Sequence, residues 1–440
     1  MHLLLLILLI LLFISWLNNN HDIFSPSFIF CSSFIFSSVW AILYQEKWSF
    51  DPDYKTILVV SMGVLFFVIF SSLIHYCMRD NLKSHIKEDL IKIEQWKYIL
   101  FILFEIFTII LLAKSVMNAT QIHGFSNLSQ AIFTYRHNSL NGTLLRTIPG
   151  FVNTLRICVS SSGYWFAYFF SLKLVNKKIP VYETIIILLA MVNSSLLGGR
   201  NGIINMIISI IVCYYFIYSR KNNFRLKFKF FQILKIILLF FLILYLFQFV
   251  GNILGRNINA DVSIIDYLAK YCGAPLKNLD IFITSNRIGD IHGNNQTFIY
   301  LVQWIGSKIG MYTDYVLDLP FQSINNFNLG NVYTTFYPYL YDYGYFGEFF
   351  LVGFMAIICQ FFYESCKKKN NPNKLIFFTV MYAYLFNALV FSFFSNKFYE
   401  QYFSLSFLKT LIFWELFDLF FLRIKYKTNK IKINFNGKLR

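Results

Sequence analysis

The tripeptide Gly-Arg-Asn occurs twice in the sequence, and its arginines are well suited to chemistry on a phosphate. The copies occupy residues 199–201 and 255–257 and place Arg200 and Arg256 in the same local setting. A guanidinium donates two parallel hydrogen bonds to phosphate, and a preceding glycine lets the backbone approach a ligand closely. Two such arginines would suit a pyrophosphate. An arginine near a helix end can also simply reach for lipid headgroups, and that alternative stays open.

Several other ionisable residues are candidates for binding or acid–base work. Arg156 lies inside an apolar segment, where an ionisable residue is costly and therefore suggests a function. His292, in a turn-rich segment, is a candidate general base, although a loop histidine is more often only solvated. Asp280 and Asp342 are further candidates. The sequence contains no HExxH or Walker motif and no CxxC pair, so we expect neither a metal nor another cofactor.

The elements that position these residues are predicted to be membrane-spanning helices. Hydrophobic residues form 57% of the chain and charged residues 14%, whereas a soluble domain carries about 25% charge. Apolar blocks of roughly 17–25 residues recur, the length that crosses about 30 Å of hydrocarbon. We therefore predict an all-α, polytopic bundle of about eleven transmembrane helices. The predicted spans are 2–17, 23–44, 57–77, 97–117, 150–172, 180–197, 202–219, 230–250, 346–364, 374–395 and 405–422.

Basic residues are concentrated in alternate loops, which are cytoplasmic by the positive-inside rule. The net charge of +17 is then a topology signal and an affinity for anionic membrane lipids, not a sign of nucleic-acid binding. The chain divides into residues 1–250, with eight helices and an outer loop at 118–149, and a large extracytoplasmic loop at 251–345. Residues 346–440 hold three helices and a basic cytoplasmic tail.

The large outer loop is predicted to hold structure of its own. Helical patterns occur at 262–275 and at 297–311, and the second stretch is too short to span, which favours a re-entrant or interfacial helix. Aromatic residues are dense in this loop. They are typical of an interfacial belt, but also of a platform for sugar rings. The acidic and amide residues among them favour a groove for a polar ligand.

Residues 331–347 resemble a segment of the Wzy-type O-antigen polymerases, a family that polymerises oligosaccharide repeat units. In that family the segment enters a late transmembrane helix and reads as asparagine with Tyr-Thr, then aromatics, then Asp-x-Gly-x-x-Gly. The last part is matched here by the run from Asp342 to Gly347. Residues 267–282 are similar to an early stretch of the family's outer loop, and residues 198–202 to its arginine-bearing turn.

The resemblance implies a glycosyltransferase with a GT-C-like fold that needs no metal or nucleotide. Such an enzyme joins undecaprenyl-pyrophosphate-linked repeat units at the periplasmic face of the cell inner membrane, with a chain-length regulator as a possible partner. An O-antigen ligase, or a flippase of the same lipid-linked glycan, is the alternative. The residue roles that we expect are pyrophosphate contacts from Arg200, Arg256 and Arg156, acid–base work by His292, Asp342 or Asp280, and sugar contacts from Asn331, Tyr333 and Tyr337.

Overall fold

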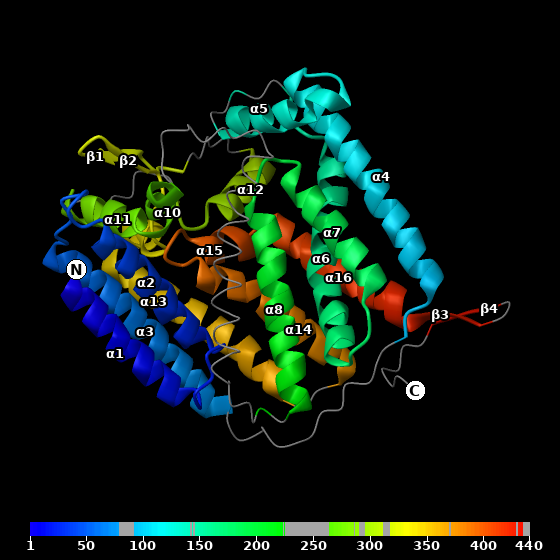
Figure 1. The fold of residues 1–440 in the computed structure, drawn as a ribbon, viewed down its shortest axis with the longest axis horizontal. Helices are drawn as coiled ribbons and strands as arrows, with labels where there is room; N and C mark the ends of the chain where they lie inside the picture. The colour runs from blue at the N-terminus through cyan, green and yellow to red at the C-terminus, as the bar shows by residue number, and fades with distance from the viewer. Residues whose placement is uncertain are drawn as a thin grey trace. The chain divides into compact units, whose positions relative to one another are not determined.

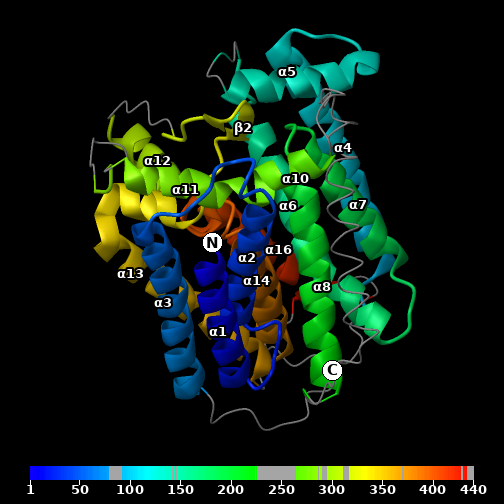
Figure 2. The same cartoon turned by 60° about the vertical axis from the view of Figure 1, so that its left-hand side comes forward.

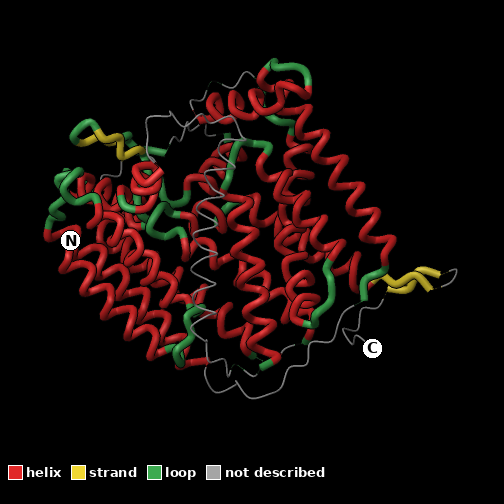
Figure 3. The backbone as a smooth tube through the Cα atoms, viewed as in Figure 1, coloured by secondary structure: helices red, strands yellow, loops and turns green. Residues whose placement is uncertain are grey.

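The computed structural model shows a chain that is almost entirely helical, with two short β-hairpins (Figure 1, Figure 3). It describes residues 1–78, 92–140, 143, 146–222, 224, 264–285, 287–289, 295–310, 317–368, 371–427 and 430–433. The chain divides into two compact units. Unit 1 comprises Met1–Leu82, Asp261–Lys368 and Leu385–Leu408, and unit 2 comprises Lys83–Ala260, Lys369–Tyr384 and Lys409–Arg440.

Four apolar helices pack together in unit 1. They are α1 (His2–Asn18), α2 (Pro26–Leu43), α3 (Tyr54–Met78) and α13 (Phe336–Lys367). Pro26 stands at the first position of α2, where its missing N–H costs nothing and its fixed φ suits a helix. Small and aromatic side chains fill the interface, as where the rings of Phe30 and Phe67 stack at 4.1 Å.

Shorter elements of unit 1 gather at one end of α1–α3 (Figure 2). They are α10 (Ile264–Cys272), α11 (Ala274–Thr284), α12 (Ile299–Ile309) and the hairpin of β1 (Gln322–Ile324) with β2 (Phe327–Gly330). The short α15 (Lys397–Tyr402) also belongs to unit 1. The hairpin turns through Asn325 and Asn326, whose φ angles of 49° and 63° are typical of a type I′ turn.

The two helical patterns predicted in the outer loop are confirmed as helices. The pattern at 262–275 is α10, and a further helix that it did not predict, α11, follows after Gly273. A Cβ at Gly273 would lie 2.9 Å from the backbone nitrogen of Ala41, so glycine permits the close approach of this corner to α2. The second pattern is α12, which ends at Gly310 with a left-handed φ of 73°.

Unit 2 is built on α4 (Gln95–Thr120), α6 (Gly150–Val175), α7 (Val181–Ser195) and α8 (Asn201–Lys221). The 3₁₀ turn η2 (Phe125–Asn127) and α5 (Leu128–Leu140) follow α4, and the chain ends with the π-helix η3 (Asp418–Arg423) and the hairpin of β3 (Ile424–Lys427) with β4 (Lys430–Ile433). The helices α14 (Pro372–Val390) and α16 (Leu405–Phe417) contribute residues to both units.

Within the described residues, six helices are long and apolar enough to cross a membrane: α2, α3, α4, α8, α13 and α14. Two more apolar helices, α1 and α7, are shorter. These helices identify a membrane-embedded protein. The predicted span at 230–250 lies outside the described residues, and the total of about eleven stays a prediction. α13 begins ten residues before the predicted span at 346–364, at Phe336.

Treating the detergent-solubilised protein with a maleimide at neutral pH is expected to modify Cys77 and spare Cys272. Cys77 is exposed, and the other six cysteines are buried. Burial raises the pKa of Cys272 to about 12, so its reactive thiolate is scarce at neutral pH and increases only as the pH rises toward that value. Peptide mass spectrometry measures both sites. In Cys77→Ser no label should remain, and rapid labelling of Cys272 in the folded variant would contradict the burial.

Candidate functional site

A pocket of unit 1 lies beside a break in α13 at Gly344. Gly344 has φ 63° and ψ −156°, inside a helix that continues on both sides. This backbone conformation is open essentially to glycine alone. A Cβ at Gly347 would overlap Tyr343 and lie 2.8 Å from the carbonyl oxygen of Tyr339. The two glycines therefore allow the chain to bend without losing the helix.

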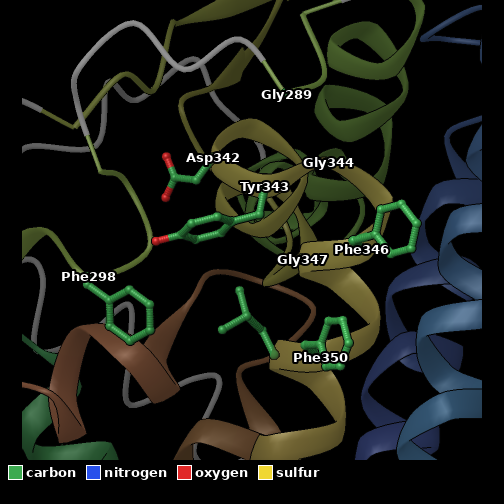
Figure 4. A pocket seen from close by; sticks show the side chains of 9 residues that line it. Gly289, Phe298, Asp342, Tyr343, Gly344, Phe346, Gly347 and Phe350 are labelled. Carbon is green, nitrogen blue, oxygen red and sulfur yellow. The ribbon is translucent and has the colours of Figure 1, made fainter.

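The pocket beside this break has a volume of about 560 Å³. Its lining consists of Gly289, Phe298, Asp342, Tyr343, Gly344, Phe346, Gly347, Phe350 and Leu351 (Figure 4). Asp342 and Tyr343 lie at one end of the pocket, and the rings of Phe298 and Phe350 lie on opposite sides of the other end (Figure 4). The pocket thus has a polar end and an apolar end.

Asp342 is held in place by the backbone of the segment that leads into α12. Its two carboxylate oxygens accept hydrogen bonds from the N–H of Gln296 at 2.9 Å and of Thr297 at 2.6 Å. The side chain is only 4% exposed. The side chain of Thr297 donates a third hydrogen bond, and since an ionised carboxylate offers about four acceptor positions, about one remains. Asp342 can therefore be fixed by the backbone and still accept a hydroxyl proton.

Arg287, two residues before the pocket-lining Gly289, forms an ion pair with Asp318. Nη2 of Arg287 donates to Oδ2 of Asp318 at 2.7 Å, and the hydroxyl of Tyr341 donates to the same oxygen at 3.0 Å. The hydrogen bond to Asp318 raises the pKa of Arg287 above its ordinary value, so the guanidinium stays charged. Its side chain is 39% exposed and is open to an anionic group.

Tyr333 and Tyr337 lie in the same region but face inward. They are 3% and 1% exposed, and their ring centroids are 4.3 Å apart. The hydroxyl of Tyr333 donates to the carbonyl of Pro320 at 2.9 Å, and that of Tyr337 donates to the carbonyl of Asp318 at 2.5 Å. In this structure both rings therefore hold the segment around Asp318 in place. The predicted sugar contacts from these tyrosines stay predictions.

Asn331 is half-buried directly after β2. The residue before it, Gly330, has a left-handed φ of 76°, and a Cβ there would lie 2.7 Å from the side chain of Lys270. Asn278 donates to the carbonyl of Val332 at 2.8 Å and so ties this turn to α11. Asn331 therefore lies at the base of the aromatic segment that leads to Tyr333.

Asp280 joins α11 to the beginning of α3. Its Oδ1 accepts hydrogen bonds from the backbone N–H of Asp53 at 2.9 Å and from the hydroxyl of Thr56 at 2.8 Å. Its Oδ2 lies 3.4 Å from Nζ of Lys277, whose ammonium also stands 4.8 Å from the ring centroid of Phe50. A carboxylate near a helix N-terminus is favourable. Through these contacts Asp280 stabilises the packing of α11 against the beginning of α3. Its catalytic role stays a prediction.

Two of the predicted phosphate ligands lie at one end of unit 2. Arg200 caps the beginning of α8 and is 5% exposed, and Arg156 lies in the second turn of α6, where its Nε donates to Oδ1 of Asn153 at 2.9 Å. The end of α4, α5, the beginning of α6 and the end of α7 share one apolar cluster. The fold therefore brings both arginines to the same end of this unit.

Arg256 and His292 lie outside the described residues. Sequence reasoning missed Arg287 as a candidate, although it lies five residues before His292 in the same turn-rich segment. The signal available was its position between α11 and a run of glycines and asparagines. Among the residues that the structure describes, no group of three or more His, Cys, Asp or Glu side chains is placed to hold a metal ion.

Comparison of this chain with protein-family models, with curated proteins and with solved structures found no match.

Replacing Asp280 with alanine is expected to destabilise the protein by about 3–5 kcal/mol, because it leaves the buried ammonium of Lys277 without its partner. The unfolding midpoint in detergent measures the change. Asp51→Ala is the matched control, because Asp51 is an exposed carboxylate in the turn before α3. A normal midpoint for Asp280→Ala together with lost activity would instead assign Asp280 to the chemistry.

Replacing Gly344 with alanine is expected to cost about 1–3 kcal/mol, because the residue must keep a conformation that only glycine adopts readily. The control is Gly150→Ala, since nothing lies within 4 Å of a Cβ at that position. Thermal unfolding followed by intrinsic fluorescence compares the two variants. Equal stability of both would show that α13 does not need the break.

Proposed function

We propose that the protein is a polymerase of the Wzy type, which joins undecaprenyl-pyrophosphate-linked oligosaccharide repeat units into a surface polysaccharide. The observation that carries this proposal is the lining of the pocket in unit 1. Asp342, Gly344 and Gly347 are the three fixed positions of the Asp-x-Gly-x-x-Gly pattern, and all three line it. The run of sequence that resembles the family is thus the run that builds the pocket.

The pocket's chemistry suits an amphiphilic substrate that carries sugars. In the reaction, a hydroxyl oxygen of the acceptor sugar attacks the anomeric carbon of the donor, and the bond from that carbon to the pyrophosphate oxygen breaks. The hydroxyl proton goes to a base, and Asp342 has the acceptor capacity and the position for it. The pyrophosphate departs with the bonding electrons, so no nucleotide is needed.

The charge on the departing pyrophosphate needs fixed cations. Arg287 supplies one in unit 1, with its guanidinium oriented by Asp318. Arg200 and Arg156, with Arg256, are the proposed contacts from elsewhere in the chain, and His292 is the alternative base. The enzyme would act at the cell inner membrane with its pocket facing the periplasm, and a chain-length regulator would be its partner.

Purified protein in lipid, given undecaprenyl-pyrophosphate-linked repeat units and no nucleotide, is expected to form a ladder of products. Arg287→Ala should slow ladder growth by about 10²–10³, the usual loss when one charge-stabilising donor is removed. Lys308→Ala is the matched control, because Lys308 is an exposed basic residue of the same loop. Gel electrophoresis resolves the products by size.

Each alternative to the polymerase has its own outcome in this assay. A single transfer without a ladder would indicate a ligase, and substrate that crosses the bilayer unchanged would indicate a flippase. Equal rates for Arg287→Ala and Lys308→Ala would remove Arg287 from the site and leave the pyrophosphate to Arg200, whose alanine variant is then the next to test.

A further inference from the structure

A second pocket lies within unit 2, at the beginning of the helix α14. It has a volume of about 170 Å³ and is lined by residues of α6, α14, α16 and η3. Asn373 and Lys374 line it from the first turn of α14, a helix long and apolar enough to cross a membrane. The end of such a helix lies near the lipid headgroups, where tryptophan is enriched. Trp165 and Trp414 also line the pocket, which is therefore placed to meet the polar part of a membrane lipid.

The lining of this pocket carries charges of both signs. Nε and Nη2 of Arg423 both donate to Oδ2 of Asp418, at 2.7 Å and 2.6 Å. Oε2 of Glu415 lies 4.0 Å from the same guanidinium, which is too far for a hydrogen bond. Arg423 and Asp418 therefore neutralise each other, and Lys374 and Glu415 remain as exposed charges of opposite sign. A ligand with one positive and one negative group suits this lining better than an ion of either sign.

The amide of Asn373 indicates which kind of positive group fits. Its Oδ1 is buried and, within the part of the chain that the structure describes, accepts no hydrogen bond. A buried acceptor without a donor costs free energy, and native structures usually satisfy it. A primary ammonium has three N–H donors, whereas a quaternary ammonium has none. With the carboxylates of Glu415 and Asp418 in the same lining, the acceptors favour a primary ammonium.

The size of the pocket and its cations indicate the rest of the ligand. Its volume of about 170 Å³ is below the roughly 300–1,000 Å³ of most ligand pockets, so the bound group is small. Lys374 and Arg423 are the lining cations, and both side-chain types form charge-assisted hydrogen bonds with phosphate. An ethanolamine phosphate carries a primary ammonium and a phosphate on a short ethylene link, and it therefore has the charges, the donors and the size that this lining requires.

We propose that this pocket binds the headgroup of phosphatidylethanolamine from the surrounding bilayer. The ammonium is held by Asn373 and Glu415, and the phosphate by Lys374 and Arg423. The acyl chains remain in the bilayer, because the pocket has room only for the headgroup. The pocket belongs to unit 2 and shares no residue with the pocket beside Gly344, so this inference does not depend on the proposed function.

The test offers three lipids with identical acyl chains to the full-length protein in a non-ionic detergent, and native mass spectrometry measures the fraction of protein that retains each. We expect phosphatidylethanolamine to be retained about tenfold more strongly than phosphatidylcholine, whose quaternary ammonium donates no hydrogen bond to Asn373. Phosphatidylglycerol, which has no ammonium, should be retained no better than phosphatidylcholine. Equal retention of the three lipids would overturn the proposal.

A matched pair of variants assigns the selectivity to this pocket. Glu415→Gln removes the carboxylate that faces the ammonium and should reduce the retention of phosphatidylethanolamine to the level of phosphatidylcholine. Glu46→Gln makes the same change at an exposed glutamate of unit 1 and should leave the preference unchanged. Since both side chains are exposed, neither variant is expected to unfold. The same preference in both variants would contradict the assignment.

Two further measurements test the phosphate contact and the source of the headgroup. Lys374→Gln weakens the hold on the phosphate, which phosphatidylethanolamine and phosphatidylcholine share, so it should lower the retention of both lipids and keep their ratio. A change of the ratio in Lys374→Gln would contradict the proposed orientation. Soluble glycerophosphoethanolamine should not displace the lipid at equal concentration, and displacement would overturn a membrane lipid as the ligand.

Discussion

The carboxylate of Asp342 links three parts of unit 1 that lie far apart in the sequence. It accepts the N–H groups of Gln296 and Thr297 before α12 while its own backbone belongs to the first turns of α13. Thr297 in turn donates its hydroxyl to the carbonyl of Pro338 at 3.0 Å, and its carbonyl accepts from Asn396 at 3.1 Å, just before α15. A buried N–H without a partner costs about 1–3 kcal/mol. The hydrogen bonds of this network therefore stabilise one another's positions. The polar end of the pocket exists because this network is complete.

The break at Gly344 separates two environments on one helix. Before it, hydroxyl and carboxylate groups of α13 form hydrogen bonds to residues 296, 297 and 318. After it, Phe346 and Phe350 are exposed on a membrane-length helix. A straight helix would keep its backbone hydrogen bonds continuous and leave no space beside residue 344. The glycines thus permit a pocket that is lined by polar and by apolar side chains.

Polar groups also organise the packing of α3 against α13. Nδ1 of His75 lies 2.7 Å from Oε1 of Glu364, with both side chains buried, and Gln360 donates to the same carboxylate at 2.8 Å. Further along, Gly63 only leaves room for Glu348, whose Oε1 would lie 2.5 Å from a Cβ at that position. Polar groups in membrane helices are costly unless they face the bundle and find partners. Such contacts set the register of the two helices, which apolar packing alone leaves loose.

The sequence by itself determined the membrane helices, because the length of an apolar block reflects the thickness of the bilayer and not the choice of partner. It also predicted α10 and α12 and singled out the run at 331–347, whose last residues line the pocket, but it did not predict α11. Only the tertiary structure decided the partners of that run. Arg287 and Asp318 are 31 residues apart, and Asp280 bonds to Asp53 from a distance of 227 residues. Likewise, Tyr333 and Tyr337 read as open sugar contacts but are buried, since the segment at 317–322 folds over them. A local sequence pattern indicates the period and polarity of one helix or strand. The contacts of Arg287, Asp280 and the two tyrosines depend instead on which elements pack together.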